Sequence, residues 1–181
     1  YGDALEELIE FGHAVGMKYA TVGSLPKEML QARASVLEAA ERFNAAAERM
    51  KSEGMFIGFH SHGPDFQPLD GETPWDILFS NTEPEVVMQL DIGNTLGGGA
   101  DPCLYLERYP GRARTVHVKD HSAADKEALA VGDGDVDWTR VFDLCERLHD
   151  PEWYVVEQAC EAYMPMECAE ISLRNLREMG R

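Results

Sequence analysis

Apolar and polar positions divide the chain into short apolar runs separated by longer amphipathic stretches. The short runs occupy residues 18–22, 55–60, 86–91, 114–118 and 153–157. Each has the length of a strand and is rich in aromatic or β-branched residues, which favours a strand over a helix. The sequence therefore predicts five strands.

The stretches between these runs have the periodicity of helices, with apolar residues three or four positions apart. They cover residues 5–15, 27–52, 138–148 and 166–179, with shorter helices expected to begin at Pro74 and Pro102. Strict alternation of strands and helices predicts an α/β fold, a parallel sheet covered by helices, within one domain over residues 1–181. The alternation fits an open sheet and a closed barrel equally well. The irregular segment 123–137, rich in Asp and Gly, is a candidate lid or substrate loop.

Composition mainly restricts the possible partners. The chain is 44% hydrophobic and 27% charged, as globular proteins are, but its formal net charge is −17. Such a charge repels nucleic acid and anionic membranes. No run of about 18 apolar residues predicts a membrane span. We therefore expect neither nucleic acid nor a membrane as a partner.

The cysteines and the first residues give a weak indication of the compartment. No secretory signal opens the sequence, and the cysteines have no CxxC spacing: Cys103, Cys145, Cys160 and Cys168. A disulfide scaffold is not expected at this size and cysteine density. We expect reduced or buried cysteines and a cytoplasmic location.

Residues able to bind a metal or move a proton stand where the predicted strands end. They are His60 and His62 on the second strand, Asp91 on the third, His117 on the fourth and Glu157 on the fifth. Parallel strands place their carboxyl ends on one face of the sheet, where active sites form. Two imidazoles and two carboxylates can fill much of the coordination shell of a transition metal. Each residue alone has a structural explanation, but the series predicts a metal site.

Five motifs extend this pattern. They are Gly58-Phe59-His60-Ser61-His62, Leu90-Asp91-Ile92-Gly93-Asn94, His117-Val118-Lys119-Asp120, the segment from Gly132 to Trp138, and Val156-Glu157-Gln158. In this order they resemble the sugar isomerase/epimerase superfamily with the xylose-isomerase-like TIM barrel, over essentially all 181 residues. The resemblance implies a (β/α) fold of TIM-barrel type, of which this chain supplies the C-terminal five of eight β/α units. The two unpaired strand edges of such a piece make a homo-oligomer possible.

The resemblance also implies the ligand set. The family usually binds one divalent metal with Glu, Asp, His and Glu on four successive strands. Asp91, His117 and Glu157 match the last three, and His60 stands in place of the first glutamate, with His62 as the alternative ligand. The implied cofactor is one divalent ion: Mn, Co, Zn, Mg or Fe.

The implied reaction is proton abstraction next to a carbonyl of a small sugar or keto-sugar. Glu157 would move the proton, and His60 or His62 would serve the opposite substrate face. Lys119 would neutralise developing negative charge or hold a substrate hydroxyl or phosphate. Asn94 stands where several epimerases have a histidine and is a candidate substrate contact. Trp138 either stacks on the sugar or simply begins a helix.

Three alternatives remain. The histidine in place of glutamate makes a lyase or dehydratase acting on 3-keto-glycosides or inososes a serious alternative to an isomerase or epimerase. A nuclease is disfavoured by the net charge and by the total of six histidines. A non-catalytic carbohydrate-binding or structural remnant is the alternative from another class, because strands of the barrel are missing.

Overall fold

A curved sheet of parallel strands forms the frame of the protein. The computed structural model describes residues 2–124, 129–157 and 163–181. The strands lie side by side in chain order: β1 (Tyr19–Val22), β2 (Phe56–His60), β3 (Val87–Asp91), β4 (Thr115–Val118) and β5 (Trp153–Val156). All five predicted strands are confirmed to within one residue at either end.

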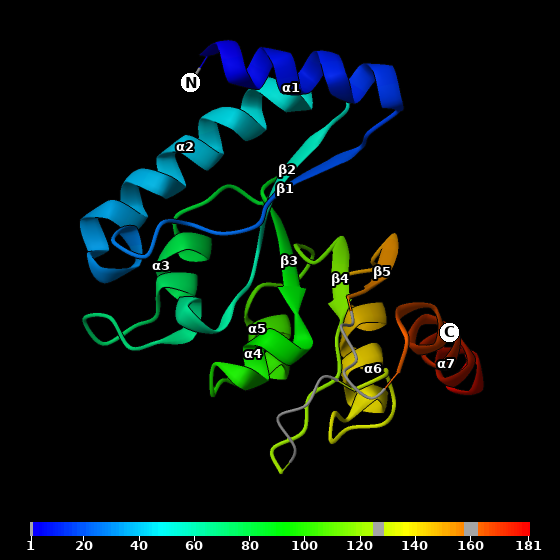
Figure 1. Cartoon of the computed structure of the whole chain (residues 1–181). Coiled ribbons are helices and arrows are strands. Elements are labelled where there is room, and N and C mark those ends of the chain that lie inside the picture. The colour runs from blue at the N-terminus through cyan, green and yellow to red at the C-terminus, as the bar shows by residue number, and fades with distance from the viewer. Residues whose placement is uncertain (1, 125–128, 158–162) are drawn as a thin grey trace.

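Helices follow one another around the outside of the strands in the order of the chain (Figure 1). They are α1 (Gly2–Val15), α2 (Arg33–Lys51), α3 (Pro74–Ser80), α4 (Ile92–Gly97), α5 (Pro102–Arg108), α6 (Trp138–Leu148) and α7 (Pro165–Glu178). Short 3₁₀ turns cover Met29–Gln31 and Gly63–Phe66. Among the described residues, no helix is both long enough and apolar enough to cross a membrane.

Two helix predictions need correction. The helix predicted over residues 27–52 begins only at Arg33, because Ala32 is extended (φ −138°, ψ 123°) and separates α2 from the preceding 3₁₀ turn. Helix α4 was not predicted, since its sequence contains two glycines. It forms because the carboxylate of Asp91 accepts a hydrogen bond from the backbone N–H of Asn94 and so caps its first turn.

The sheet curves into a half-barrel. Lys18 precedes β1 and Glu152 precedes β5, yet Lys18 Nζ lies 2.5 Å from Glu152 Oε1. The two outer strands therefore approach each other at their amino ends. Trp153 and Val155 on β5 remain exposed, because the described chain supplies no strand beyond β5.

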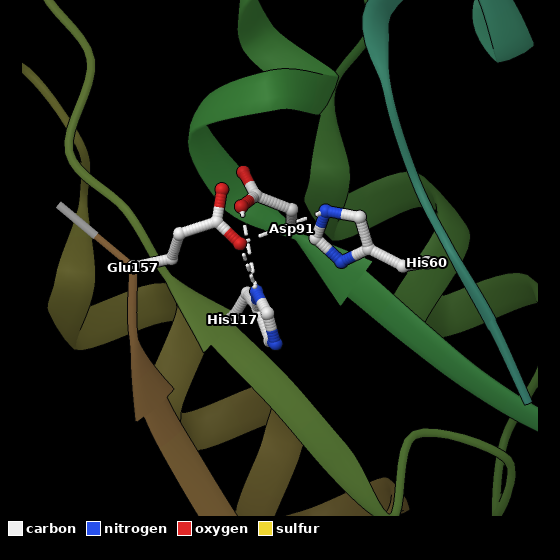
Figure 2. Close-up of side chains that lie close together, drawn as sticks. All are labelled: His60, Asp91, His117 and Glu157. Carbon is white, nitrogen blue, oxygen red and sulfur yellow. Dashed lines mark hydrogen bonds and ion pairs between the residues drawn. The ribbon is translucent and has the colours of Figure 1, made fainter. Parts of the chain in front are cut away.

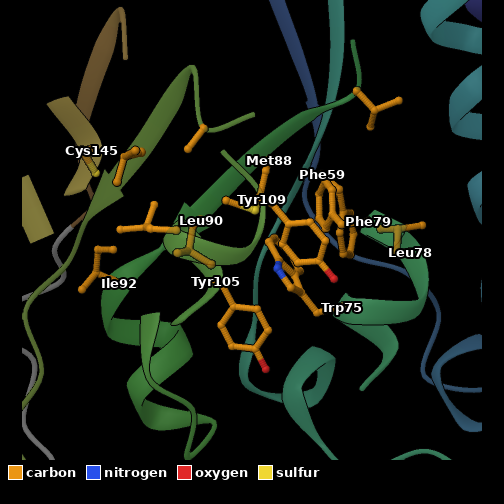
Figure 3. Close-up of a cluster of buried hydrophobic side chains, with 14 of the residues drawn as sticks. Phe59, Trp75, Leu78, Phe79, Met88, Leu90, Ile92, Tyr105, Tyr109 and Cys145 are labelled. Carbon is orange, nitrogen blue, oxygen red and sulfur yellow. The ribbon is translucent and has the colours of Figure 1, made fainter. Parts of the chain in front are cut away.

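Alternation along the strands separates the two faces of the sheet. Phe59 points outward, and its ring centroid lies 5.8 Å from both Phe43 of α2 and Trp75 of α3. Figure 3 shows this outer core, in which aromatic rings of α3 and α5 pack against side chains of β2 and β3. His60 and Asp91 point to the opposite, inner side. The apolar outer face stabilises the fold and leaves the inner face for polar groups.

Cysteine chemistry differs in part from the expectation. Cys103 and Cys145 are free and buried, as predicted, but Cys168 is disulfide-bonded. Low cysteine density argues against a disulfide scaffold, but it does not exclude an individual bridge. Cys160, Gln158 and residues 125–128 of the predicted loop lie outside the described residues.

A buried arginine fastens the connection between α3 and β3. Arg112 is 7% exposed, and its guanidinium donates to the backbone oxygens of Phe79, Thr82, Glu83 and Val86. Burial lowers the pKa of Arg112 to about 10, which leaves it charged at neutral pH. Its removal would leave several buried carbonyls without a donor.

We predict that Arg112→Ala lowers the free energy of unfolding by about 3–5 kcal/mol, because it combines a cavity with unsatisfied buried carbonyls. Urea denaturation followed by circular dichroism measures the change. The matched control is Arg147→Ala, whose exposed pair with Asp143 should contribute at most about 0.5 kcal/mol. Equal losses in the two variants would contradict the role given to Arg112.

Candidate metal centre

The carboxyl ends of four neighbouring strands each contribute one side chain to a polar cluster on the inner face (Figure 2): His60, Asp91, His117 and Glu157. Register explains the convergence. Asp91 pairs directly with His117 across β3 and β4, and His60 pairs with the residue two positions before Asp91. Side chains two positions apart on a strand share a face, so all four point inward. The structure thus brings together the residues that the sequence predicts as ligands.

The spacing of the four donor groups is close to that expected around a single metal ion. One ligand atom from each residue can be chosen so that all lie within 4.8 Å of one another. His117 Nδ1 lies 2.8 Å from Glu157 Oε2 and 3.8 Å from Asp91 Oδ2, and His60 Nε2 lies 3.9 Å from Glu157 Oε2. Metal–ligand bonds of about 2.0–2.2 Å place the donors around one ion roughly 3–4.4 Å apart. The two nitrogens and two carboxylates suit Zn²⁺, Mn²⁺, Co²⁺ or Fe²⁺.

The cluster contains buried polar atoms with unused bonding capacity. Among the described residues, Asp91 Oδ2 and His60 Nδ1 have no hydrogen-bond partner, although the two side chains are almost fully buried. Burial raises the pKa of Asp91 to about 7. Burial, together with the nearby charge of His117, lowers the pKa of His60 to about 4. A carboxylate and a neutral imidazole held in this way are suited to a cation.

Glu157 lies between a lysine and an imidazole. Lys119 Nζ donates to Glu157 Oε1 at 3.2 Å, while the other carboxylate oxygen faces His117. Burial raises the pKa of Glu157, but the hydrogen bond and positive charge of Lys119, with a further contribution from His117, outweigh it and give a net decrease. Burial also lowers the pKa of His117, against the opposing effect of Glu157. The carboxylate therefore stays ionised near neutral pH.

The other residues predicted for the site differ in their placement. His62 lies beside the cluster, with its ring centroid 4.7 Å from that of His60. Lys119 reaches the cluster through Glu157. Asn94 turns its side-chain amide back to the carbonyl of Ser61 at 3.0 Å, so that amide is already engaged.

Trp138 is buried, and its placement corrects the substrate-stacking interpretation. It is 5% exposed, begins α6 and stacks on Phe142 with ring centroids 5.5 Å apart. Its indole N–H donates to Asp120. A bulky apolar residue at the start of a helix more often joins the core than binds a ligand, and the structure places Trp138 in this way.

Two supporting residues were not predicted from the sequence. The carboxylate of Asp120, which is 5% exposed, accepts from the backbone N–H of Gly132 at 2.6 Å and from Trp138 Nε1 at 3.1 Å, and so fastens the second half of the predicted loop to the end of β4. Ser61 is fully buried, and its hydroxyl accepts from the backbone N–H of Asp91 at 2.8 Å. Both residues lie inside the quoted motifs, but their contacts depend on the register between strands.

Comparison with known proteins agrees with this architecture. A family model described as a xylose isomerase-like TIM barrel matches residues 3–179, which confirms the resemblance noted in the sequence. Inosose dehydratase from Clostridium tetani (strain Massachusetts / E88) is 28% identical in an alignment 137 positions long, which covers 65% of this chain and 45% of that relative. The chain spans about half the length of the curated relatives it matches.

Solved structures share the fold at lower identity. A sugar phosphate isomerase/epimerase from Parabacteroides distasonis ATCC 8503 superposes with a TM-score of 0.81 and 24% identity, over 97% of this chain and 65% of that one. The IolI protein with a binding zinc atom superposes with a TM-score of 0.75 and 13% identity, over 97% of this chain and 67% of that one. At these identities the likeness confirms the TIM-barrel type of fold alone.

We predict that Asp91→Asn stabilises the metal-free protein at pH 8. The folded-state pKa of Asp91, about 7, exceeds its ordinary value of 3.8, so its proton stabilises the fold fully below about pH 4 and ceases to do so as the pH rises through 7. One pKa unit corresponds to about 1.4 kcal/mol, so a shift of about three units sets an upper limit of about 4 kcal/mol on the gain at pH 8.

Thermal denaturation in chelator at pH 5 and pH 8 measures this effect. The asparagine retains the side-chain oxygen that caps the first turn of α4, so wild type and variant have the same helix cap. The gain should shrink at pH 5, and a variant less stable than wild type at pH 8 would contradict the cost assigned to the buried carboxylate.

Proposed function

Because the chain belongs to the xylose isomerase-like TIM-barrel family, we propose that it is a divalent-metal-dependent enzyme that isomerises or epimerises a small sugar or keto-sugar. The observation that carries this proposal is the convergence of His60, Asp91, His117 and Glu157 on the inner face of the half-barrel. Solved relatives with the same fold support it. They include a sugar phosphate isomerase/epimerase and a protein with a bound zinc atom.

The four clustered side chains would hold the metal. The chemistry that a divalent cation supplies when bound is polarisation of a carbonyl group and acidification of the neighbouring C–H bond. The inner face offers the rest of the site: an ionised carboxylate, several imidazoles and one lysine within a few ångströms. This combination suits proton transfer next to a carbonyl.

Glu157 is the residue best placed to move the proton. Its depressed pKa keeps it ionised, and Lys119 orients one carboxylate oxygen. His60 lies across the cluster from Glu157 (Figure 2), and the ring of His62 packs against that of His60, so an imidazole on this side would return the proton to the substrate. Lys119 would compensate negative charge that develops on the substrate oxygen. Isomerisation and epimerisation differ only in where the proton returns.

A dehydratase is the second candidate. Relatives named inosose dehydratase, at 28% identity, favour it over other reactions in the family. Proton abstraction by Glu157 would be followed by departure of the hydroxyl on the neighbouring carbon as water, for which a histidine in its protonated form would supply the second proton. The same residues therefore serve both reactions, and the product distinguishes them.

We predict that Glu157→Gln abolishes proton exchange at the substrate carbon. A panel of ketoses, keto-glycosides and inososes is incubated with metal-loaded protein in D₂O, and nuclear magnetic resonance follows deuterium incorporation. The amide cannot accept the proton, so exchange should fall by about 10²–10⁴-fold. Loss of one water from the product mass would identify the dehydratase.

The control for this prediction is Glu152→Gln, which removes a carboxylate at the opposite, amino-terminal end of β5. It should retain exchange. Full exchange by Glu157→Gln with a complete metal complement would disprove the role of Glu157. Metal binding without exchange on any substrate of the panel would favour the non-catalytic alternative.

A further inference from the structure

Nearly all the hydrogen-bonding capacity of Asp91 is engaged by neighbouring residues. Its backbone N–H donates to Ser61 Oγ at 2.8 Å, and its carbonyl oxygen accepts from Thr95 Oγ1 at 2.6 Å. Its Oδ1 accepts from the backbone N–H of Asn94 at 2.6 Å. Within the described residues, Oδ2 alone remains without a hydrogen-bond partner.

The partners of Asp91 are themselves fixed. Ser61 and Thr95 are fully buried, and the backbone N–H of Ser61 donates to the carbonyl of Gln89 on β3. The side-chain amide of Asn94 donates to the carbonyl of Ser61. This is a second hydrogen bond that links the end of β2 to the start of α4. The backbone of Asp91 is therefore held on both sides, and the hydrogen bond from Asn94 occupies one of its two carboxylate oxygens.

Close packing at Gly93 strengthens this arrangement. A Cβ atom at Gly93 would lie 2.9 Å from the backbone oxygens of Lys119 and Asp120, so the start of α4 lies directly against the end of β4. The turn that carries Asp91 is thereby held from the β2 side by Ser61 and from the β4 side by backbone contact. Oδ2 faces His117 Nδ1 at 3.8 Å.

We propose that Ser61, Asn94 and Thr95 form a clasp that makes Asp91 a one-oxygen metal ligand through Oδ2, with Ser61 as the principal positioning residue. The inference rests on the proposed metal site and assigns a function to residues outside the ligand set. Groups that orient a ligand commonly change metal affinity by about 10–100-fold when they are removed. Ser61 therefore contributes to affinity without touching the ion.

The test measures Co²⁺ binding to the full chain by competition with a chromophoric chelator, together with the visible absorption spectrum of bound Co²⁺. The variants are Ser61→Ala and Thr95→Val, each of which removes one buried hydroxyl. The matched control is Ser172→Ala. Ser172 is also fully buried, and its hydroxyl likewise accepts a backbone N–H, that of Val131, away from the cluster.

We expect Ser61→Ala to weaken Co²⁺ binding about 10–100-fold and to alter the Co²⁺ spectrum, with a several-fold weakening in Thr95→Val. Ser172→Ala should lower the melting temperature comparably but leave affinity and spectrum unchanged. If Ser61→Ala fails to fold, Thr95→Val decides. Wild-type affinity in the folded clasp variants would overturn this inference alone, whereas absence of Co²⁺ binding to wild type would overturn the proposed function as well.

Discussion

The buried carboxylate of Asp91 is the constraint on which the organisation of the inner face depends. A carboxylate without solvent favours its neutral form, and burial accordingly raises the pKa of Asp91 to about 7. Its neighbours satisfy one oxygen and leave the other directed at His117. The free-energy cost of burying this carboxylate occurs where the ends of four strands bring donor groups together. A bound cation removes the cost, so that metal binding and stability are expected to be linked.

The rest of the structure makes that placement possible. Alternation along the strands directs apolar side chains outward, where Phe59 and Trp75 pack, and leaves the inner face to polar groups. Arg112 fixes the connection that leads into β3, and Asp120 fastens the loop that follows β4. The candidate metal ligands and the apolar core that stabilises the fold therefore lie on opposite faces of the same strands.

Much of the fold and of the candidate site could be predicted from sequence, because strand order and side-chain alternation alone bring the ends of successive strands together. The ranges of the strands and the convergence of the four side chains follow from that logic, while their role as metal ligands stays a prediction. Helix α4 was missed because its stability comes from a cap on Asp91 rather than from its own composition. The contacts of Ser61 and Asn94 were missed because they depend on three-dimensional register. The buried position of Trp138 decides between two interpretations that its sequence context leaves open.

The most direct test of the metal centre is the metal content of protein purified without chelator, measured by mass spectrometry for wild type, His117→Ala and His121→Ala. His117 lies in the cluster, whereas His121 lies four residues further along the same segment and outside it. The account predicts about one divalent transition metal per wild-type chain, retained in His121→Ala and lost in His117→Ala. A wild-type protein that binds no metal even after reconstitution, or a His117→Ala variant with a full complement, would contradict it.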